Sequence, residues 1–254
     1  MKSERVDFKG ALGETLAGRI DKPDGKSKAC ALFAHCFTCS KNLKAVGNIT
    51  KALAKKGVET LRFDFTGLGE SEGDFANTNF SSNIDDLVAA ADFMNSRQMA
   101  PSILIGHSLG GAAVLQAAHR IESSKAVVTI GAPSEPKHVE NHFESSKKEI
   151  EEKGEAVVKL AGRPFKVKKQ FLDDLEETKM DDFIEKLNKA LLVMHAPMDE
   201  TVGIDNAAHI YKKAKHPKSF ITLHKADHLL LNETYSRYAG SLIAEWAEIY
   251  LEES

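Results

Sequence analysis

The sequence of 254 residues has little of what marks several large classes of protein. It contains three cysteines, an odd number too small for the disulfide framework of a compact secreted domain. No run approaches the roughly 20 apolar residues that span a bilayer, and the first residues lack the apolar region of a signal peptide. We therefore expect a cytoplasmic protein with no membrane partner.

An excess of one charge is also missing. The net charge is -3, and no run of Lys or Arg suggests a groove for nucleic acid. No linker, repeat or low-complexity stretch divides the chain, whose 42% hydrophobic residues can form one large core. A small neutral or mildly charged molecule is the expected partner, and the oligomeric state, including a homodimer, stays open.

Cys36 and Cys39 have the C-x-x-C spacing of some metal and redox sites. A zinc site would need more ligands, but the chain has no second cysteine pair, and His35 is the only near neighbour. We therefore expect two reduced thiols in a tight loop, with no metal and no organic cofactor.

Apolar runs alternate with segments of helical period along most of the chain. Strands are predicted at 3–9, 15–21, 29–34, 58–65, 102–107, 126–133, 190–195 and 219–224, and helices at 43–56, 82–97, 110–122, 204–214 and 229–251. This order predicts an α/β fold with a mainly parallel central sheet covered by helices on both faces. Such sheets bind ligands at the carboxyl ends of their strands.

The composition changes between residues 134 and 189, where charged helical segments flank a predicted hairpin around Gly162-Arg163-Pro164. The prediction is a core of residues 1–133 and 190–254 with a lid inserted at 134–189. A solvated helical excursion with only a structural role is the alternative. The predicted apolar wall of the lid consists of Val157, Val158, Leu160, Phe165, Phe171 and Leu172.

The segment Gly106-His107-Ser108-Leu109-Gly110 joins a predicted strand directly to a predicted helix. A G-x-S-x-G turn in this context exposes its serine, and the backbone N–H groups at the start of the helix, that of Leu109 first, favour an oxyanion. Ser108 is therefore the candidate nucleophile. An ordinary glycine-rich turn is the alternative, and phosphate-binding spacings are absent.

A serine nucleophile needs a histidine base and an acid that orients it, each in a loop just after a later strand. Asp199 and His228 meet this requirement. Residues that compete for these roles are Glu200 and Asp205 for the acid and His195, His209, His216 and His224 for the base. We expect these histidines to be packed or at the surface, and His107 to be structural.

The loop after the strand at 29–34 should supply the second oxyanion donor, the backbone N–H of Phe37. The ring of Phe37 is expected to line the acyl pocket, together with Phe165 and Phe171 from the lid.

Together these features resemble the α/β-hydrolase superfamily: the Ser108 turn, the segment Asp64 to Ser71, and the candidates Asp199 and His228. The segment His35 to Lys41 and the hairpin-bearing insertion are similar to cinnamoyl and feruloyl esterases, and to hydrolases associated with OsmC-type domains. Cys36 stands where most of the superfamily carries glycine. No OsmC-type domain is expected within these 254 residues.

The resemblance and the residues both imply a serine hydrolase that cleaves small carboxylic esters, with short to medium acyl or aryl-acyl groups, through an acyl-enzyme. The alternatives are a thioesterase, a serine aminopeptidase-like activity, or a non-catalytic binding protein that kept the fold.

Overall fold

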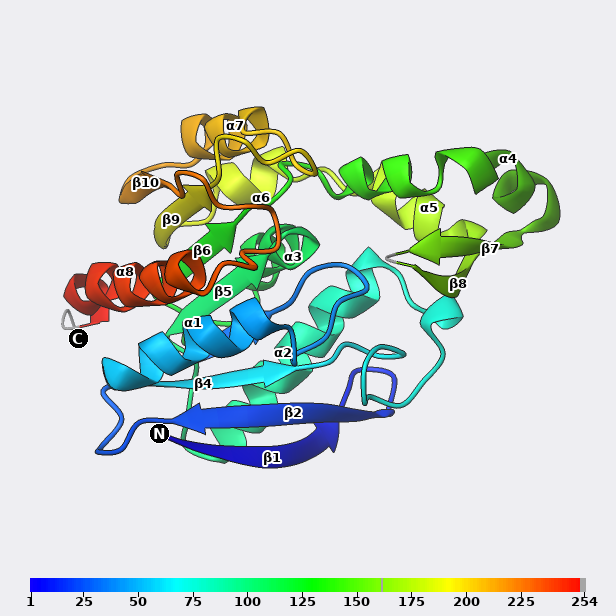
Figure 1. Cartoon of the computed structure of the whole chain (residues 1–254). Coiled ribbons are helices and arrows are strands. Elements are labelled where there is room, and N and C mark those ends of the chain that lie inside the picture. Colours follow the sequence, from blue (N-terminus) through cyan, green and yellow to red (C-terminus); the bar gives the residue numbers. More distant parts are fainter. Residues whose placement is uncertain (161, 252–254) are drawn as a thin grey trace.

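The computed structural model describes residues 1–160 and 162–251. Within them, an eight-stranded sheet has the order β1-β2-β4-β3-β5-β6-β9-β10 (Figure 1). Its strands are β1 (Lys2–Lys9), β2 (Thr15–Lys22), β3 (Ala29–Ala34), β4 (Val58–Phe63), β5 (Ile103–His107), β6 (Ala126–Ile130), β9 (Ala190–His195) and β10 (Lys218–Thr222). The pairs β1–β2 and β2–β4 are antiparallel, and the other neighbours are parallel.

The central strands are apolar on both sides because helices cover both faces of the sheet. Every residue of β5, β6 and β9 is buried. In register, His107 of β5 pairs with Ile130 of β6, which pairs with Met194 of β9. The carboxyl ends of these three strands therefore lie side by side at one edge, where the loops that follow them can meet.

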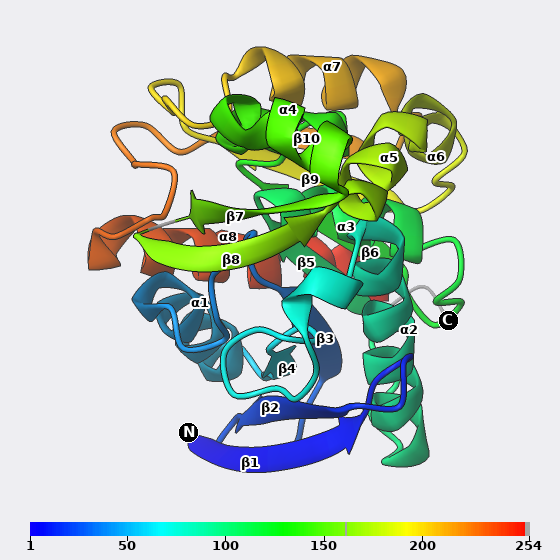
Figure 2. The same cartoon turned by 90° about the vertical axis from the view of Figure 1, so that its right-hand side faces the viewer.

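Helices α1 (Lys44–Lys55) and α8 (Glu233–Leu251) lie together on one face, and α2 (Phe80–Ser96) and α3 (Leu109–Ala117) lie on the other (Figure 2). Gly240 lets α8 approach α1 closely, since a Cβ there would lie 2.5 Å from the carbonyl oxygen of Ile49. Helix α7 (Asp205–Lys213) packs beside β9. None of the helices in the described ranges has the length and apolar character of a bilayer-spanning segment.

Two helix starts differ from the prediction by two or more residues, and local backbone chemistry explains both. Helix α2 begins at Phe80 because a capping box precedes it: Asn79 Oδ1 accepts a hydrogen bond from the N–H of Ser82, and the N–H of Asn79 donates to Ser82 Oγ. Helix α8 begins at Glu233 rather than at 229, because Leu230 has a φ of 50°, which a helix cannot contain.

The segment between β6 and β9, called the insertion below, extends past the carboxyl edge of the sheet (Figures 1 and 2). It contains the 3-10 helix η2 (Pro136–His142), α4 (Glu144–Lys153), β7 (Glu155–Leu160), β8 (Arg163–Lys168), α5 (Lys169–Glu177) and α6 (Asp181–Glu185). Strands β7 and β8 form the predicted antiparallel hairpin, although Ala161 in its turn lies outside the described residues. Apolar residues of the insertion, such as Phe143 and Leu175, join the same hydrophobic cluster as α2 and α3. Shared burial thus fixes the insertion to the core.

Candidate active site

Ser108 occupies a strained turn between β5 and α3. Its φ is 56° and its ψ is -127°, a conformation that costs a non-glycine residue about 1–3 kcal/mol. The flanking glycines make the turn sterically feasible, because a Cβ on Gly106 would lie 2.2 Å from the carbonyl oxygen of Gly110. The backbone N–H of Ser108 donates to the carbonyl oxygen of Ile130 at 2.9 Å. The turn is thereby anchored to the neighbouring strand.

The structure brings the three predicted residues into one hydrogen-bonded chain. His228 Nε2 lies 3.0 Å from Ser108 Oγ, and His228 Nδ1 lies 2.7 Å from Asp199 Oδ2. Because a carboxylate only accepts hydrogen bonds, Nδ1 carries the proton and Nε2 is left to accept from the Ser108 hydroxyl. The loops after β5, β9 and β10 supply these residues.

The second oxygen of Asp199 is held by the backbone of its own loop. Asp199 Oδ1 accepts hydrogen bonds from the N–H groups of Thr201 and Val202, each at 2.9 Å. Burial raises the pKa of Asp199, but the hydrogen bonds from His228 and from these two N–H groups outweigh it and hold the pKa below its ordinary value. Asp199 is therefore a fixed negative charge next to the imidazole.

The competing acids and histidines lie elsewhere. Glu200 is exposed, and Asp205 is in the first turn of α7. His195 is buried and donates to the carbonyl oxygen of Val202 at 2.7 Å. The remaining three, His209, His216 and His224, are all exposed at the surface.

The ring of His107 contacts the backbone of the His228 loop and does not act as a base for Ser108. Its Nε2 donates to the backbone carbonyl oxygen of His228 at 2.7 Å. Burial, and then the nearby charge of His228, lower the pKa of His107 to about 4, so the ring is neutral near pH 7. The sequence interpretation of a structural residue missed this link to the His228 loop, because it joins residues 121 positions apart.

The loop from Cys36 to Cys39 differs from the prediction. The two cysteines are joined by a disulfide rather than present as reduced thiols, and Cys30 is the free cysteine. The physical reason is a tight turn, in which the N–H of Cys39 donates to the carbonyl oxygen of Cys36 at 3.1 Å and the Cα atoms lie 5.4 Å apart. Phe37, the predicted oxyanion donor, lies between the two cysteines.

A buried ion pair holds the base of this loop. Lys41 Nζ lies 2.5 Å from Asp64 Oδ2, and the backbone N–H of Lys41 donates to Asp64 Oδ1 at 2.6 Å. Asp64 Oδ2 also accepts from the backbone N–H of Glu70 at 2.9 Å. One carboxylate thus joins the loops after β3 and β4. The sequence contained both partners, but nothing in the spacing paired them.

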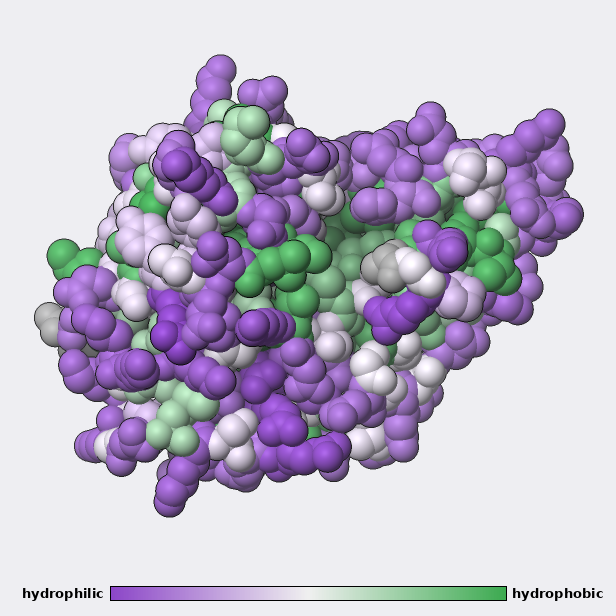
Figure 3. Space-filling view, viewed as in Figure 1, coloured by the Kyte–Doolittle hydropathy of each residue, from purple (hydrophilic) through white to green (hydrophobic). Residues whose placement is uncertain are grey.

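A cavity of about 220 Å³ opens beside Ser108. Its walls come from the loops at the carboxyl edge and from the insertion: Cys36, Phe37, Thr38, Cys39, Ser108, Pro133, His138, Val139, His142, Leu160, Thr201, Val202, His228 and Leu229. Figure 3 shows apolar side chains in the hollow between the core and the insertion. His138 and His142 are pocket residues that the sequence interpretation did not identify. Leu109, whose N–H is the other predicted oxyanion donor, begins α3 directly after Ser108.

Phe165 and Phe171 do not line this cavity. They lie behind Phe37 in a cluster of rings, with centroids 5.6 Å apart for Phe37 and Phe171 and 5.1 Å apart for Phe75 and Phe165. Val157 is not part of an apolar wall either, because it is 65% exposed. Leu160 is the member of the predicted wall that reaches the cavity.

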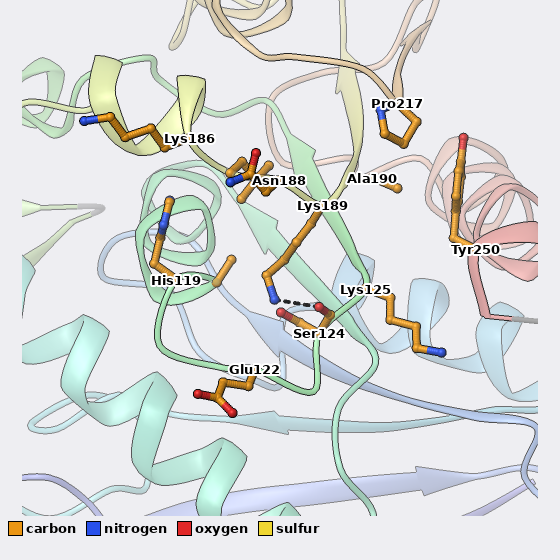
Figure 4. Close-up of a pocket in the computed structure, with 12 residues that line it drawn as sticks. His119, Glu122, Ser124, Lys125, Lys186, Asn188, Lys189, Ala190, Pro217 and Tyr250 are labelled. Carbon is orange, nitrogen blue, oxygen red and sulfur yellow. Dashed lines mark hydrogen bonds between the residues drawn. The ribbon is translucent and has the colours of Figure 1, made fainter. Parts of the chain in front are cut away.

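A larger cavity of about 670 Å³ lies at the opposite edge of the sheet, where β6 and β9 begin (Figure 4). Two of its polar side chains donate hydrogen bonds to backbone carbonyl groups of the protein itself. Lys189 Nζ donates to the carbonyl oxygen of Ser124 at 2.6 Å, and His119 Nε2 donates to that of Phe183 at 2.8 Å. Because Ser108 and His228 lie at the other edge, this cavity is not the reaction site.

The sequence model of a family described as serine aminopeptidase S33 matches residues 25–157, more than half of the chain. The chain belongs to this family. It is 46% identical to the esterase domain of a Rhodothermus marinus protein, with a TM-score of 0.81 and coverage of 99% of this chain and 100% of that one.

Two further comparisons are more distant. Est1E from Butyrivibrio proteoclasticus, solved with ferulic acid, is 21% identical and has a TM-score of 0.83, covering 95% of this chain and 98% of that chain, so it shares the fold. Rat mitochondrial palmitoyl-protein thioesterase ABHD10 is 31% identical over 128 residues, which span 49% of this chain and 42% of that protein. The predicted α/β-hydrolase fold is confirmed, and the family makes the chain a hydrolase.

Proposed function

We propose that the protein is a serine esterase that cleaves small carboxylic esters through an acyl-enzyme. The observation that carries this proposal is the continuous hydrogen-bonded chain from Asp199 through His228 to Ser108, beside a partly apolar cavity. The similarity to an esterase domain along the whole chain supports it. A non-catalytic binding protein would have no need of a strained Ser108 joined to a histidine and a buried acid.

In the first step, His228 Nε2 takes the proton of the Ser108 hydroxyl while Oγ attacks the acyl carbon of the ester. The backbone N–H groups of Phe37 and Leu109 donate to the oxyanion that forms. The imidazolium, stabilised by the charge of Asp199, then gives its proton to the departing alcohol. In the second step, water loses a proton to His228, attacks the acyl-enzyme and releases the acid.

The cavity supports a preference for small acyl groups. Its volume of about 220 Å³ lies below the roughly 300–1,000 Å³ of pockets that enclose drug-sized ligands. Leu160 and Val139 supply apolar walls from the insertion, which acts as a lid in this proposal. We expect short to medium acyl or aryl-acyl esters of small alcohols, in a cytoplasmic setting.

Thioester cleavage is the second candidate function, because the rat relative is named a palmitoyl-protein thioesterase. The same acyl-enzyme forms from an ester or a thioester, so Ser108, His228 and Asp199 would serve both reactions. Cleavage of an N-terminal peptide bond, which the family description names, would also need a group that binds a free amine.

A fluorophosphonate probe and an ester panel test the proposal. The probe should label the wild-type protein on Ser108, and Ser108→Ala should remove both the label and all but a residual rate, with a loss of roughly 10⁴–10⁶-fold in kcat. His228→Ala should act similarly, because the base is lost. His224→Ala is the matched control, since His224 is exposed on the same loop. Comparable ester turnover by the Ser108→Ala protein would refute the assignment.

A further inference from the structure

The Cys36–Cys39 disulfide encloses the residue on which the oxyanion hole depends. Phe37 and Thr38 are the two residues between the bonded cysteines, and the N–H of Phe37 is the donor assigned above. Both cysteines also line the cavity that contains Ser108. The covalent bond and the proposed reaction centre thus share one small space.

The loop inside the disulfide is strained. Thr38 has a φ of 58°, which is unfavourable for a β-branched residue and persists only where the surroundings hold it. Three restraints hold it here: the disulfide, the bond from the Cys39 N–H to the Cys36 carbonyl oxygen, and a hydrogen bond from the Arg163 guanidinium to the carbonyl oxygen of Thr38. Reduction breaks the disulfide directly, whereas it does not act on the two hydrogen bonds.

The disulfide is also within reach of a small molecule. Cys36 is 4% exposed and Cys39 is half-buried, so a reactant that enters the cavity meets the Cys39 sulfur more readily. We propose that Cys36–Cys39 is a thiol–disulfide exchange site inside the substrate cavity, and that its reduction by a small thiol slows ester hydrolysis by releasing the oxyanion loop. The effect on rate rests on the esterase function proposed above.

The exchange is balanced with two thiols as the reductant. A thiolate attacks the Cys39 sulfur, the Cys36–Cys39 bond breaks, and Cys36 leaves as a thiolate while Cys39 carries a mixed disulfide. A second thiolate attacks the small-molecule sulfur of that mixed disulfide, so that a small disulfide is released and Cys39 leaves as a thiolate. The protein gains two electrons and, from the two thiols, two protons.

Reduction should affect turnover more than folding. The ion pair between Lys41 and Asp64 does not involve the disulfide, so we expect the base of the loop and the surrounding core to stay in place on reduction. Thr38 can then relax toward negative φ and carry the N–H of Phe37 away from the oxyanion. Loss of one oxyanion donor lowers kcat by about 10²–10³, which sets the upper limit of the effect. We expect a fall in kcat of roughly tenfold or more, with KM changed less than about twofold.

The test compares the oxidised and the reduced protein of residues 1–254. One sample is treated with dithiothreitol and passed through a desalting column under argon, and hydrolysis of p-nitrophenyl butyrate is then measured for both. Differential alkylation with mass spectrometry reports the state of each cysteine, and reoxidation should restore the rate. Incubation with glutathione should give a glutathione adduct on Cys39. Circular dichroism monitors the fold.

Variants separate the disulfide from other thiol effects. The double variant Cys36→Ser with Cys39→Ser should have the low kcat of the reduced protein and no response to dithiothreitol. Cys30→Ser is the matched control and should keep the full response, because Cys30 is a free cysteine in β3.

Equal kcat in the two redox states, a disulfide that dithiothreitol leaves intact, or global unfolding on reduction would overturn the inference. An oxidised protein that neither hydrolyses the ester nor reacts with a fluorophosphonate would instead overturn the proposed function.

Discussion

Replacing Asp199 by asparagine tests whether His228 needs the negative charge of the carboxylate or only a hydrogen-bonding side chain of the same size. Asparagine at this position keeps the size of the side chain but removes the negative charge that fixes the proton on His228 Nδ1. Asp199→Asn should lower kcat by about 10⁴-fold, because the wrong imidazole tautomer then faces Ser108. Steady-state kinetics on a small ester measures this. Glu200→Gln is the control, since Glu200 is exposed, and an equal loss there would reassign the acid.

The lowered pKa of His107 in the folded protein predicts that stability depends on pH. Its pKa falls from 6.5 to about 4 on folding, so between these values the unfolded chain binds a proton that the folded chain does not. Stability from this residue is therefore complete above pH 6.5 and decreases as the pH falls toward 4. The difference between the pKa of 6.5 in the unfolded chain and about 4 in the folded chain corresponds to about 3 kcal/mol.

The variant His107→Gln should make the free energy of unfolding less dependent on pH in this window. Urea denaturation at a series of pH values measures the slope. The exposed His224→Gln is the control and should keep the wild-type slope. An unchanged slope in the His107→Gln protein would show that His107 does not remain neutral in the folded state.

Sequence reasoning selected residues that meet in the structure where the argument used only their position along the chain. Ser108, Asp199 and His228 each follow a buried strand directly, and the structure joins these three by hydrogen bonds. It failed where the role depends on a neighbour distant in sequence or on side-chain direction. Phe171 is an apolar residue of a predicted lid, but nothing in its spacing shows that it packs behind Phe37. The disulfide was missed because the cysteine count and the expected cytoplasmic setting favoured reduced thiols, whereas a disulfide depends on how closely the tight loop brings Cys36 and Cys39 together.

Elements were predicted well where burial on both faces produces a continuous apolar run. The strands β3 and β9 have the predicted bounds, since each is a continuous, largely buried apolar run that ends at a histidine or just before one. Helix ends were predicted less well, because capping by Asn79 and the backbone of Leu230 decide them. The hairpin of β7 and β8 was located from its turn residues, but which of its faces meets the core could not be inferred.

Two residues of strand β7 allow a test of whether this strand contributes to the preference for acyl length. Leu160 reaches the cavity, whereas Val157 on the same strand is exposed. Leu160→Ala should lower kcat/KM for butyryl and hexanoyl esters more than for acetyl esters, because the longer chains lose an apolar wall worth about 1–3 kcal/mol. Val157→Ala is the matched control and should leave the ranking of acyl groups unchanged. An unchanged ranking in the Leu160→Ala protein would place the acyl chain elsewhere.

At the scale of the whole molecule, the two cavities described above lie at opposite edges of the sheet. The parallel order of β5, β6 and β9 gathers three loops at the carboxyl edge, and the insertion covers the same edge. The larger cavity, near the amino ends of β6 and β9, has no part in this arrangement. Cavity size is therefore a poor guide to the site here, and strand direction is a better one.

The same architecture predicts how acyl length affects the rate. The insertion shares its hydrophobic cluster with α2 and α3, so opening a wider cavity would expose buried residues such as Phe143 and Phe171. The energetic cost of that exposure opposes the binding of long chains. In a series of p-nitrophenyl esters from acetyl to palmitoyl, kcat/KM should peak at short to medium chains and fall steeply beyond them. The same series of acyl groups, presented as thioesters, tests whether thioester cleavage has the same dependence on acyl length. If palmitoyl esters or thioesters are the best substrates, the insertion must move away from the core, and the small-ester proposal fails.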